Sequence, residues 1–153
     1  MYHMTATGHA IIGTVIAAKI GNPYIAVPIA FASHFLADMV PHWDTGTHYR
    51  KKSAITFFLQ TFLDVMFGFI LAGLVLYYIF PFTNPLYALL IIVVAQLPDW
   101  MMAPYVFFKM KKFPFSKWSY DIQTKLQNKQ DKPWGIINQV AILLLLIFIA
   151  RLF

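Results

Sequence analysis

Two histidines and two aspartates fall within one short apolar segment, Ser33-His34-Phe35-Leu36-Ala37-Asp38-Met39-Val40-Pro41-His42-Trp43-Asp44. Imidazole nitrogens and carboxylate oxygens are common ligands of divalent metal ions. His34 and Asp38 are four residues apart, so on a helix they share one face, with Cβ atoms roughly 6 Å apart, and can bind one ion. His42 continues this face if the helix persists through Pro41. The chemistry that this segment favours is metal binding.

The composition places this segment in a membrane protein. The 153 residues are 59% hydrophobic and 18% aromatic, with a mean hydropathy of +0.63. A soluble domain of this length cannot bury so much apolar surface in one core. The chain contains no cysteine, so any bound metal must take nitrogen and oxygen ligands.

Hydropathy predicts five membrane-spanning helices, since about 20 apolar residues cross a hydrocarbon core of ~30 Å. They cover residues 5–20, 24–40, 53–80, 86–108 and 135–153. Between the last two, Trp118, Ile122 and Leu126 recur at four-residue spacing, which predicts a short helix at the membrane surface. We therefore expect an all-α fold, a polytopic membrane helical bundle of about five transmembrane helices plus a short interfacial helix. It forms a single domain over residues 1–153.

The basic residues predict the orientation. Ten of the twelve lysines and arginines fall in connections that five spans place on one side, with only Lys19 and Arg151 on the other. By the positive-inside rule the richer side faces the cytoplasm, so we expect the N-terminus on the cytoplasmic side of the cell (inner) membrane. The net charge of +6 suits attraction to anionic lipid headgroups. No motif argues for nucleic acid, and membrane lipids are the expected partners.

Polar residues within the predicted spans gather in the cytoplasmic half. Asp64 and Asp99 lie roughly 14 to 17 Å from that end of their helices. His9 lies near the start of the first span, which is on the same side of the membrane as the end of the second span. A carboxylate inside a membrane costs several kcal/mol unless it is paired or faces water, so a functional site is the default interpretation.

Two glutamines accompany these aspartates. Gln60 lies about one turn before Asp64, and Gln96 nearly one turn before Asp99. They could orient the carboxylates through hydrogen bonds, although ordinary hydrogen bonding between helices explains them equally well. A weak internal repeat also matches Val40-Pro41-His42-Trp43 with Leu97-Pro98-Asp99-Trp100. It pairs Asp99 with His42, so Asp99 is a possible metal ligand as well as a possible base.

A family resemblance rests on three groups of residues: Thr7-Gly8-His9, the segment from Ser33 to Asp44, and Pro98-Asp99. Together they resemble the prokaryotic membrane-bound metal-dependent hydrolases and, more faintly, zinc-dependent phospholipase C and the single-strand nucleases. The resemblance implies an all-helical metal site with His9, His34, Asp38 and His42 as ligands. The chain has no glutamate, so the His-x3-Glu ligand pair of the soluble enzymes has no counterpart.

The resemblance and the polar residues on the cytoplasmic side together predict a hydrolase that uses a divalent metal, with Zn²⁺ as the first candidate. We expect it to act on a lipid-like phosphoester from the cytoplasmic side. A divalent ion lowers the pKa of a bound water from about 15.7 toward ~7. Asp99 or Asp64 is the expected general base, since burial raises the pKa of a carboxyl group. Asp44, in the turn after Pro41, is a third catalytic candidate. Arg50 and Lys51 are weaker candidates for contact with a substrate phosphate.

Two other functions remain open. Asp64, Asp99 and His34 could form the relay of a cation or proton carrier or channel, although the outer halves of the spans carry no polar path. The second alternative is a membrane assembly protein whose metal only holds helices together. Sequence does not distinguish a structural metal from a catalytic one.

Overall fold

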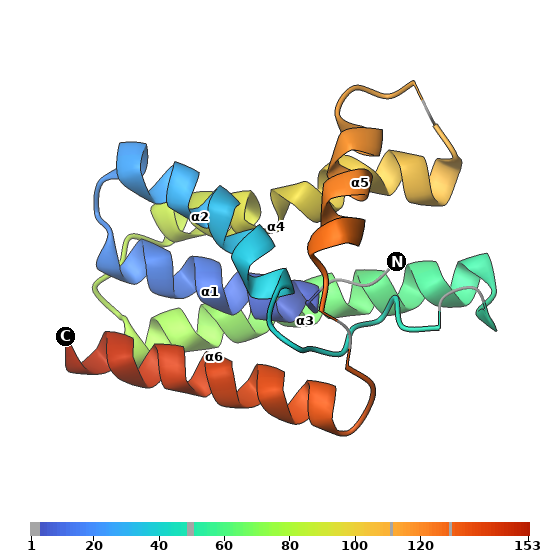
Figure 1. The fold of residues 1–153 in the computed structure, drawn as a ribbon. Coiled ribbons are helices and arrows are strands. Elements are labelled where there is room, and N and C mark those ends of the chain that lie inside the picture. The colour runs from blue at the N-terminus through green and yellow to red at the C-terminus, as the bar shows by residue number, and fades with distance from the viewer. Residues whose placement is uncertain (1–3, 49–50, 111, 129) are drawn as a thin grey trace.

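The computed structural model describes residues 4–48, 51–110, 112–128 and 130–153, and these ranges contain six helices and no strands. In chain order the helices are α1 (Ala6–Lys19), α2 (Pro23–Asp38), α3 (Ala54–Ile79), α4 (Pro85–Phe108), α5 (Ser116–Leu126) and α6 (Trp134–Leu152). Figure 1 shows α5 crossing the direction of the other helices at one end of the bundle. The prediction of an all-α helical bundle is confirmed.

Polar N-cap residues begin helices α1, α2, α3 and α4. Each accepts a hydrogen bond from a backbone N–H in the first turn, as N-cap residues do: Thr5 for α1, Asn22 for α2, Ser53 for α3 and Asn84 for α4. Proline follows the cap at the start of α2 and of α4, where its missing N–H costs nothing. The sequence thus fixes these helix starts locally.

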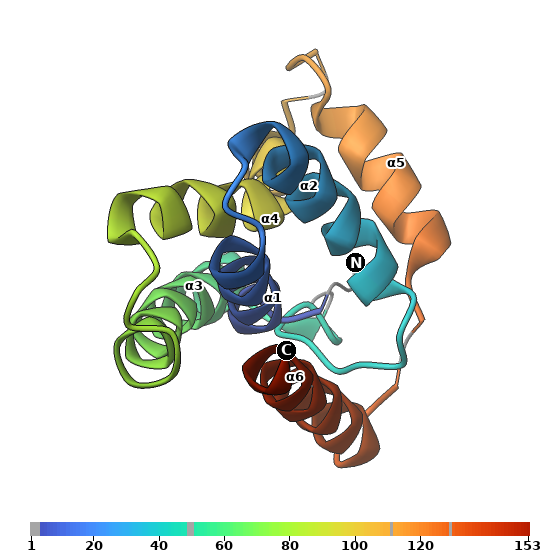
Figure 2. The same cartoon turned by 90° about the vertical axis from the view of Figure 1, so that its left-hand side faces the viewer.

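Helix α1 is the centre of the bundle, with α2, α3, α4 and α6 arranged around it in Figure 2. Glycines allow close approach on two sides of α1. A Cβ on Gly13 would lie 2.9 Å from the Cα of Ile92 in α4, and one on Gly68 in α3 would lie 3.0 Å from the Cα of Thr7. Alanines fill much of the remaining core. Such small-residue packing is typical of helices that associate in a membrane.

Three helices, α3, α4 and α6, are long and apolar enough to cross a membrane, with 26, 24 and 19 residues. Helices α1 and α2 have 14 and 16 residues, which reach only about 21 and 24 Å at 1.5 Å per residue. The prediction of five spans is therefore supported for three. Turn residues shorten the first two: Gly21-Asn22-Pro23 separates them, and α2 ends at Asp38, shortly before Pro41, because residues preceding a proline disfavour helix.

The two short helices form a hairpin that is anchored at one end of the long ones. The Tyr87 hydroxyl, near the start of α4, donates a hydrogen bond to the carbonyl of Ile20 at the hairpin tip. Lys19 Nζ lies 6.0 Å from the ring of Phe80, where α3 ends. The opposite ends of the hairpin therefore stop part-way along α3 and α4, and they place His9 and His34 within the depth of the long helices.

The short helix α5 packs with its polar side inward. Ser116, Ser119 and Gln123 are buried, while Trp118 is exposed. Ser119 Oγ donates a hydrogen bond to Pro98 O in α4, and Gln123 Nε2 donates to Ser119 Oγ, both at 2.7 Å. The structure therefore fixes α5 against the part of α4 that contains Pro98 and leaves Trp118 facing outward.

Candidate metal centre

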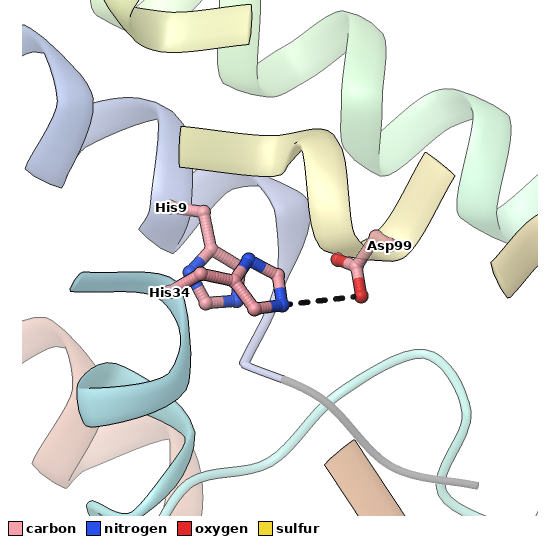
Figure 3. A group of neighbouring side chains, drawn as sticks. All are labelled: His9, His34 and Asp99. Atoms are coloured by element: carbon pink, nitrogen blue, oxygen red, sulfur yellow. Dashed lines mark ion pairs between the residues drawn. The ribbon is translucent and has the colours of Figure 1, made fainter. Parts of the chain in front are cut away.

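Two stacked imidazoles from neighbouring helices form the centre of the candidate site. His9 comes from α1 and His34 from α2, and both are fully buried. Their ring centroids lie 3.8 Å apart, with an interplanar angle of 17°. Figure 3 shows the two rings overlapping, with the carboxylate of Asp99 from α4 beside them. Three helices thus bring one polar group each to one place.

Two carboxylates lie within ion-pair distance of these rings. His34 Nε2 is 3.5 Å from Asp99 Oδ1 and 3.7 Å from Asp38 Oδ2, and His9 Nε2 is 3.4 Å from Asp38 Oδ1. Asp38 is completely buried and its Oδ1 accepts a hydrogen bond of 2.7 Å from the backbone N–H of Met4. The predicted face shared by His34 and Asp38 is therefore present, and the fold adds His9 and Asp99 to it.

The backbone of α4 sets the orientation of His34. His34 Nδ1 lies 2.8 Å from the carbonyl oxygen of Ala95, and because a carbonyl only accepts, Nδ1 carries the proton. The helical hydrogen bond that Pro98 cannot make is the one to the carbonyl of Val94, the residue before Ala95. A histidine held in this way by a backbone carbonyl presents its other nitrogen as a ligand, which is the usual arrangement around bound metals.

The donor set fits a divalent ion. The two ring nitrogens of His9 and Nε2 of His34 are buried. Both Nε2 atoms lie 3.4 to 3.7 Å from carboxylate oxygens, while His9 Nδ1 has no hydrogen-bond partner among the described residues, a state that costs about 1–3 kcal/mol. Suitable ligand atoms of His9, His34 and Asp99 all lie within 4.8 Å of one another. Two ligands of a tetrahedral ion at ~2.1 Å lie roughly 3.4 Å apart, and the histidine nitrogens lie 3.4 to 3.7 Å from the carboxylate oxygens. One divalent charge would also balance Asp38 and Asp99.

A small cavity lies beside this cluster. Its volume is about 90 Å³, and Asp44, Asp64 and Asp99 line it together with apolar side chains such as Phe57 and Trp100. The three aspartates named as catalytic candidates from the sequence thus share one cavity. Asp44 is 4% exposed, and its Oδ1 accepts a hydrogen bond from the Thr47 hydroxyl at 2.8 Å.

Asp64 holds the N-terminus of α1. Its Oδ2 accepts from the backbone N–H of Ala6 at 2.8 Å, and its Oδ1 accepts from the backbone N–H and the hydroxyl of Thr7 at 3.3 and 2.7 Å. A carboxylate at this position satisfies N–H groups that no residue within the helix can reach, and it interacts favourably with the positive end of the helix dipole. Asp64 therefore positions the helix that carries His9.

None of the remaining predicted residues that the structure describes belongs to the group of His9, His34 and Asp99. His42 is buried, with Nδ1 2.7 Å from Val40 O, and it is not in the group formed by His9, His34 and Asp99. Gln60 Oε1 accepts from Lys52 Nζ at 2.8 Å rather than contacting Asp64. Gln96 is fully buried, and its Nε2 donates a long hydrogen bond of 3.5 Å to Ile92 O. Lys51 is exposed, and Arg50 lies outside the described residues.

Sequence reasoning missed the segment that follows α5. The backbone N–H of Asn128 donates to Asp38 O at 3.0 Å, His42 N donates to Asn128 O at 3.3 Å, and Gln130 N donates to His42 O at 3.0 Å. This short pairing fixes the turn that carries His42 against a segment nearly 90 residues later. No local sequence pattern predicts this pairing, because backbone atoms alone make these hydrogen bonds.

Comparisons add no further assignment, because no protein family, curated protein or solved structure matches this chain.

Proposed function

We propose that this protein is a membrane-embedded, metal-dependent hydrolase that acts on a lipid-like phosphoester from the cytoplasmic side. The observation that carries the proposal is the group of buried His9 and His34 with Asp99, beside a cavity lined by two further aspartates. Two imidazoles and one carboxylate match the donor set of several catalytic zinc sites, in which water or substrate takes the fourth position. The family resemblance of the first 44 residues and Pro98-Asp99 points in the same direction.

In the proposed chemistry the three aspartates have different roles, because their contacts differ. When bound, a divalent ion, with Zn²⁺ as the first candidate, would acidify water and polarise a phosphoryl group. Asp99 belongs with the metal ligands because it lies against His34. Asp44 is the group that we assign to accept the proton from water, since it lines the cavity without belonging to the cluster. Asp64 fixes α1 and through it His9.

The proposed location follows from the helices and the charges. α3, α4 and α6 supply membrane-spanning segments, and their ends nearer the basic connections would face the cytoplasm by the positive-inside rule. In the proposed orientation the cavity lies in the cytoplasmic half of the cell membrane, within reach of lipid headgroups. A lipid-like substrate suits such a cavity because it can enter from the bilayer.

The test is hydrolysis of a phospholipid with a fluorescent group on its phosphoester, by purified protein in vesicles. We expect activity that disappears with a chelator and returns with Zn²⁺. Asp44→Asn should keep its metal and lose on the order of 10² to 10⁴ in rate, the usual contribution of a general base. His48→Ala is the matched control, because His48 is an exposed histidine that pairs with Asp131.

Three outcomes would overturn the proposal. Full activity of both Asp44→Asn and His34→Ala would show that the hydrolysis arises elsewhere. Metal binding without hydrolysis would favour the assembly protein, and uptake of protons or cations into sealed vesicles that depends on Asp99 would favour the carrier.

A further inference from the structure

An apolar groove runs along the bundle between α3 and α6, with α1 beneath it. Figure 2 shows these two helices on different sides of α1. The groove has a volume of about 490 Å³, which is within the range of small-molecule sites. Ile11 lies on its floor, Leu71 and Val75 on the α3 side, and Leu143 and Ile147 on the α6 side.

Polar groups gather at one end of this groove. Thr7, Asp64 and Gln139 line it there, with Thr5 and Trp43. Gln139 Nε2 donates a hydrogen bond to the Thr5 hydroxyl, while its Oε1 is buried and has no hydrogen-bond partner among the described residues. The groove is therefore apolar along its length and polar at a single end, which is the polarity of a lipid.

A cation lies at the same end. Lys132 Nζ is 4.0 Å from the centroid of the Trp43 ring, and Trp43 lines the groove. Tryptophan and lysine together are typical of the membrane interface, where the ring lies at the headgroup level and the ammonium group attracts phosphate. This end is suited to an anionic headgroup.

The groove adjoins the cavity of the candidate metal centre. Asp64 lines both. Trp43 lines the groove, and its neighbour Asp44 lines the cavity. A molecule held in the groove by its tail would therefore have its polar part beside the aspartates.

The dimensions of the groove fit one hydrocarbon chain. From Asp64 to Ile79 the α3 wall extends over 15 residues, or about 22 Å at 1.5 Å per residue, which exceeds the ~15 Å of one leaflet of a ~30 Å core. The groove is therefore long enough for an acyl chain that runs parallel to α3.

We propose that this groove binds one acyl chain of an anionic membrane phospholipid, with its phosphate at Trp43 and Lys132, and so delivers the lipid to the cavity beside the metal centre. The inference rests on the proposed function only in taking the bound lipid as the substrate.

The test uses vesicles that contain phosphatidylglycerol with a photoactivatable group in its acyl chain. After illumination, we expect adducts on the groove segments around Leu71, Val75 and Leu143. Leu144→Trp, on the α6 rim of the groove, should lose most of this labelling. Leu145→Trp should keep it, because Leu145 does not line the groove. Leu144 and Leu145 are both well exposed, at 62% and 55%, so either substitution is compatible with folding.

The headgroup contact is tested with the same probe. Lys132→Ala should reduce the adduct yield about fivefold, the effect of one lysine near an anionic surface, whereas Lys125→Ala on α5 should not. Equal labelling of Leu144→Trp and Leu145→Trp, or adducts spread evenly over exposed leucines, would overturn the inference. Labelling of the groove without hydrolysis would support the lipid site and contradict the proposed function. Hydrolysis without labelling of the groove would contradict the lipid site and support the proposed function.

Discussion

Asp64 and Asp99 show how two carboxylates at similar depth acquire different roles. Both lie roughly midway along a long helix, and both line the cavity. Asp64 accepts three hydrogen bonds from the start of α1, whereas Asp99 Oδ1 lies 3.5 Å from Nε2 of His34. The first stabilises a helix end, and the second lies against the two buried imidazoles as a candidate ligand.

Replacing Asp64 should affect stability more than metal binding. Asp64→Ala leaves the N–H groups of Ala6 and Thr7 without their acceptor, which should lower the free energy of unfolding by about 2 kcal/mol. Chemical unfolding in detergent, with metal content measured on the folded fraction, checks this. Asp121→Ala is the control and should change little, because Asp121 is half-exposed and pairs with Lys117 at the surface. Loss of metal at unchanged stability would instead make Asp64 a ligand.

Local and distant contacts explain which parts of the site could be predicted. His34 and Asp38 share a helix, so the spacing alone placed them together. Asp99 was named as both base and ligand, and only the packing of α2 against α4 brings it to His34. The cap formed by Asp64 was not predicted, because its partners lie 57 and 58 residues away and their backbone N–H groups carry no sequence signal.

At the scale of the helix, close contact depends on glycine. Gly68 faces α1, where an added Cβ would lie 3.0 Å from Thr7 Cα and 3.3 Å from Ala10 Cβ. Gly73, five residues later in α3, has nothing within 4 Å of the equivalent position. The two glycines share a helix and differ only in what they face.

This pair gives a direct test of the packing. Gly68→Ala should destabilise the protein by about 1–3 kcal/mol, because the backbone of α1 must move away, and it should weaken metal binding, since α1 carries His9. Gly73→Ala should be neutral or slightly stabilising, because alanine is the better helix former. Thermal unfolding of the two variants distinguishes them, and equal midpoints would contradict the contact between α1 and α3.

The helix positions themselves were largely predictable. Asn22-Pro23 and Asn84-Pro85 mark two starts, and the long apolar runs of α3, α4 and α6 lie close to the residues expected from hydropathy. Hydropathy could not show that α1 and α2 are too short to cross alone, because it measures composition and not where a helix ends.

For the whole molecule, the account predicts that the turn between α3 and α4 faces away from the cytoplasm. The chain has no cysteine, so a single introduced thiol reports one position. In intact cells, a membrane-impermeant maleimide should label Phe82→Cys, which is fully exposed. Lys112→Cys should react only after the membrane is opened. The opposite pattern would reverse the proposed orientation and place the candidate site on the outer side.

The central claim is that buried imidazoles and a carboxylate bind a divalent ion, and the most direct measurement is the metal content of purified protein by mass spectrometry. We expect about one ion per chain, as in other sites with three protein ligands. His34→Ala and Asp99→Ala should lose it, while His48→Ala keeps it. His42→Ala should also keep it if His9, His34 and Asp99 form the complete set. Undiminished metal in both His34→Ala and Asp99→Ala would contradict the account.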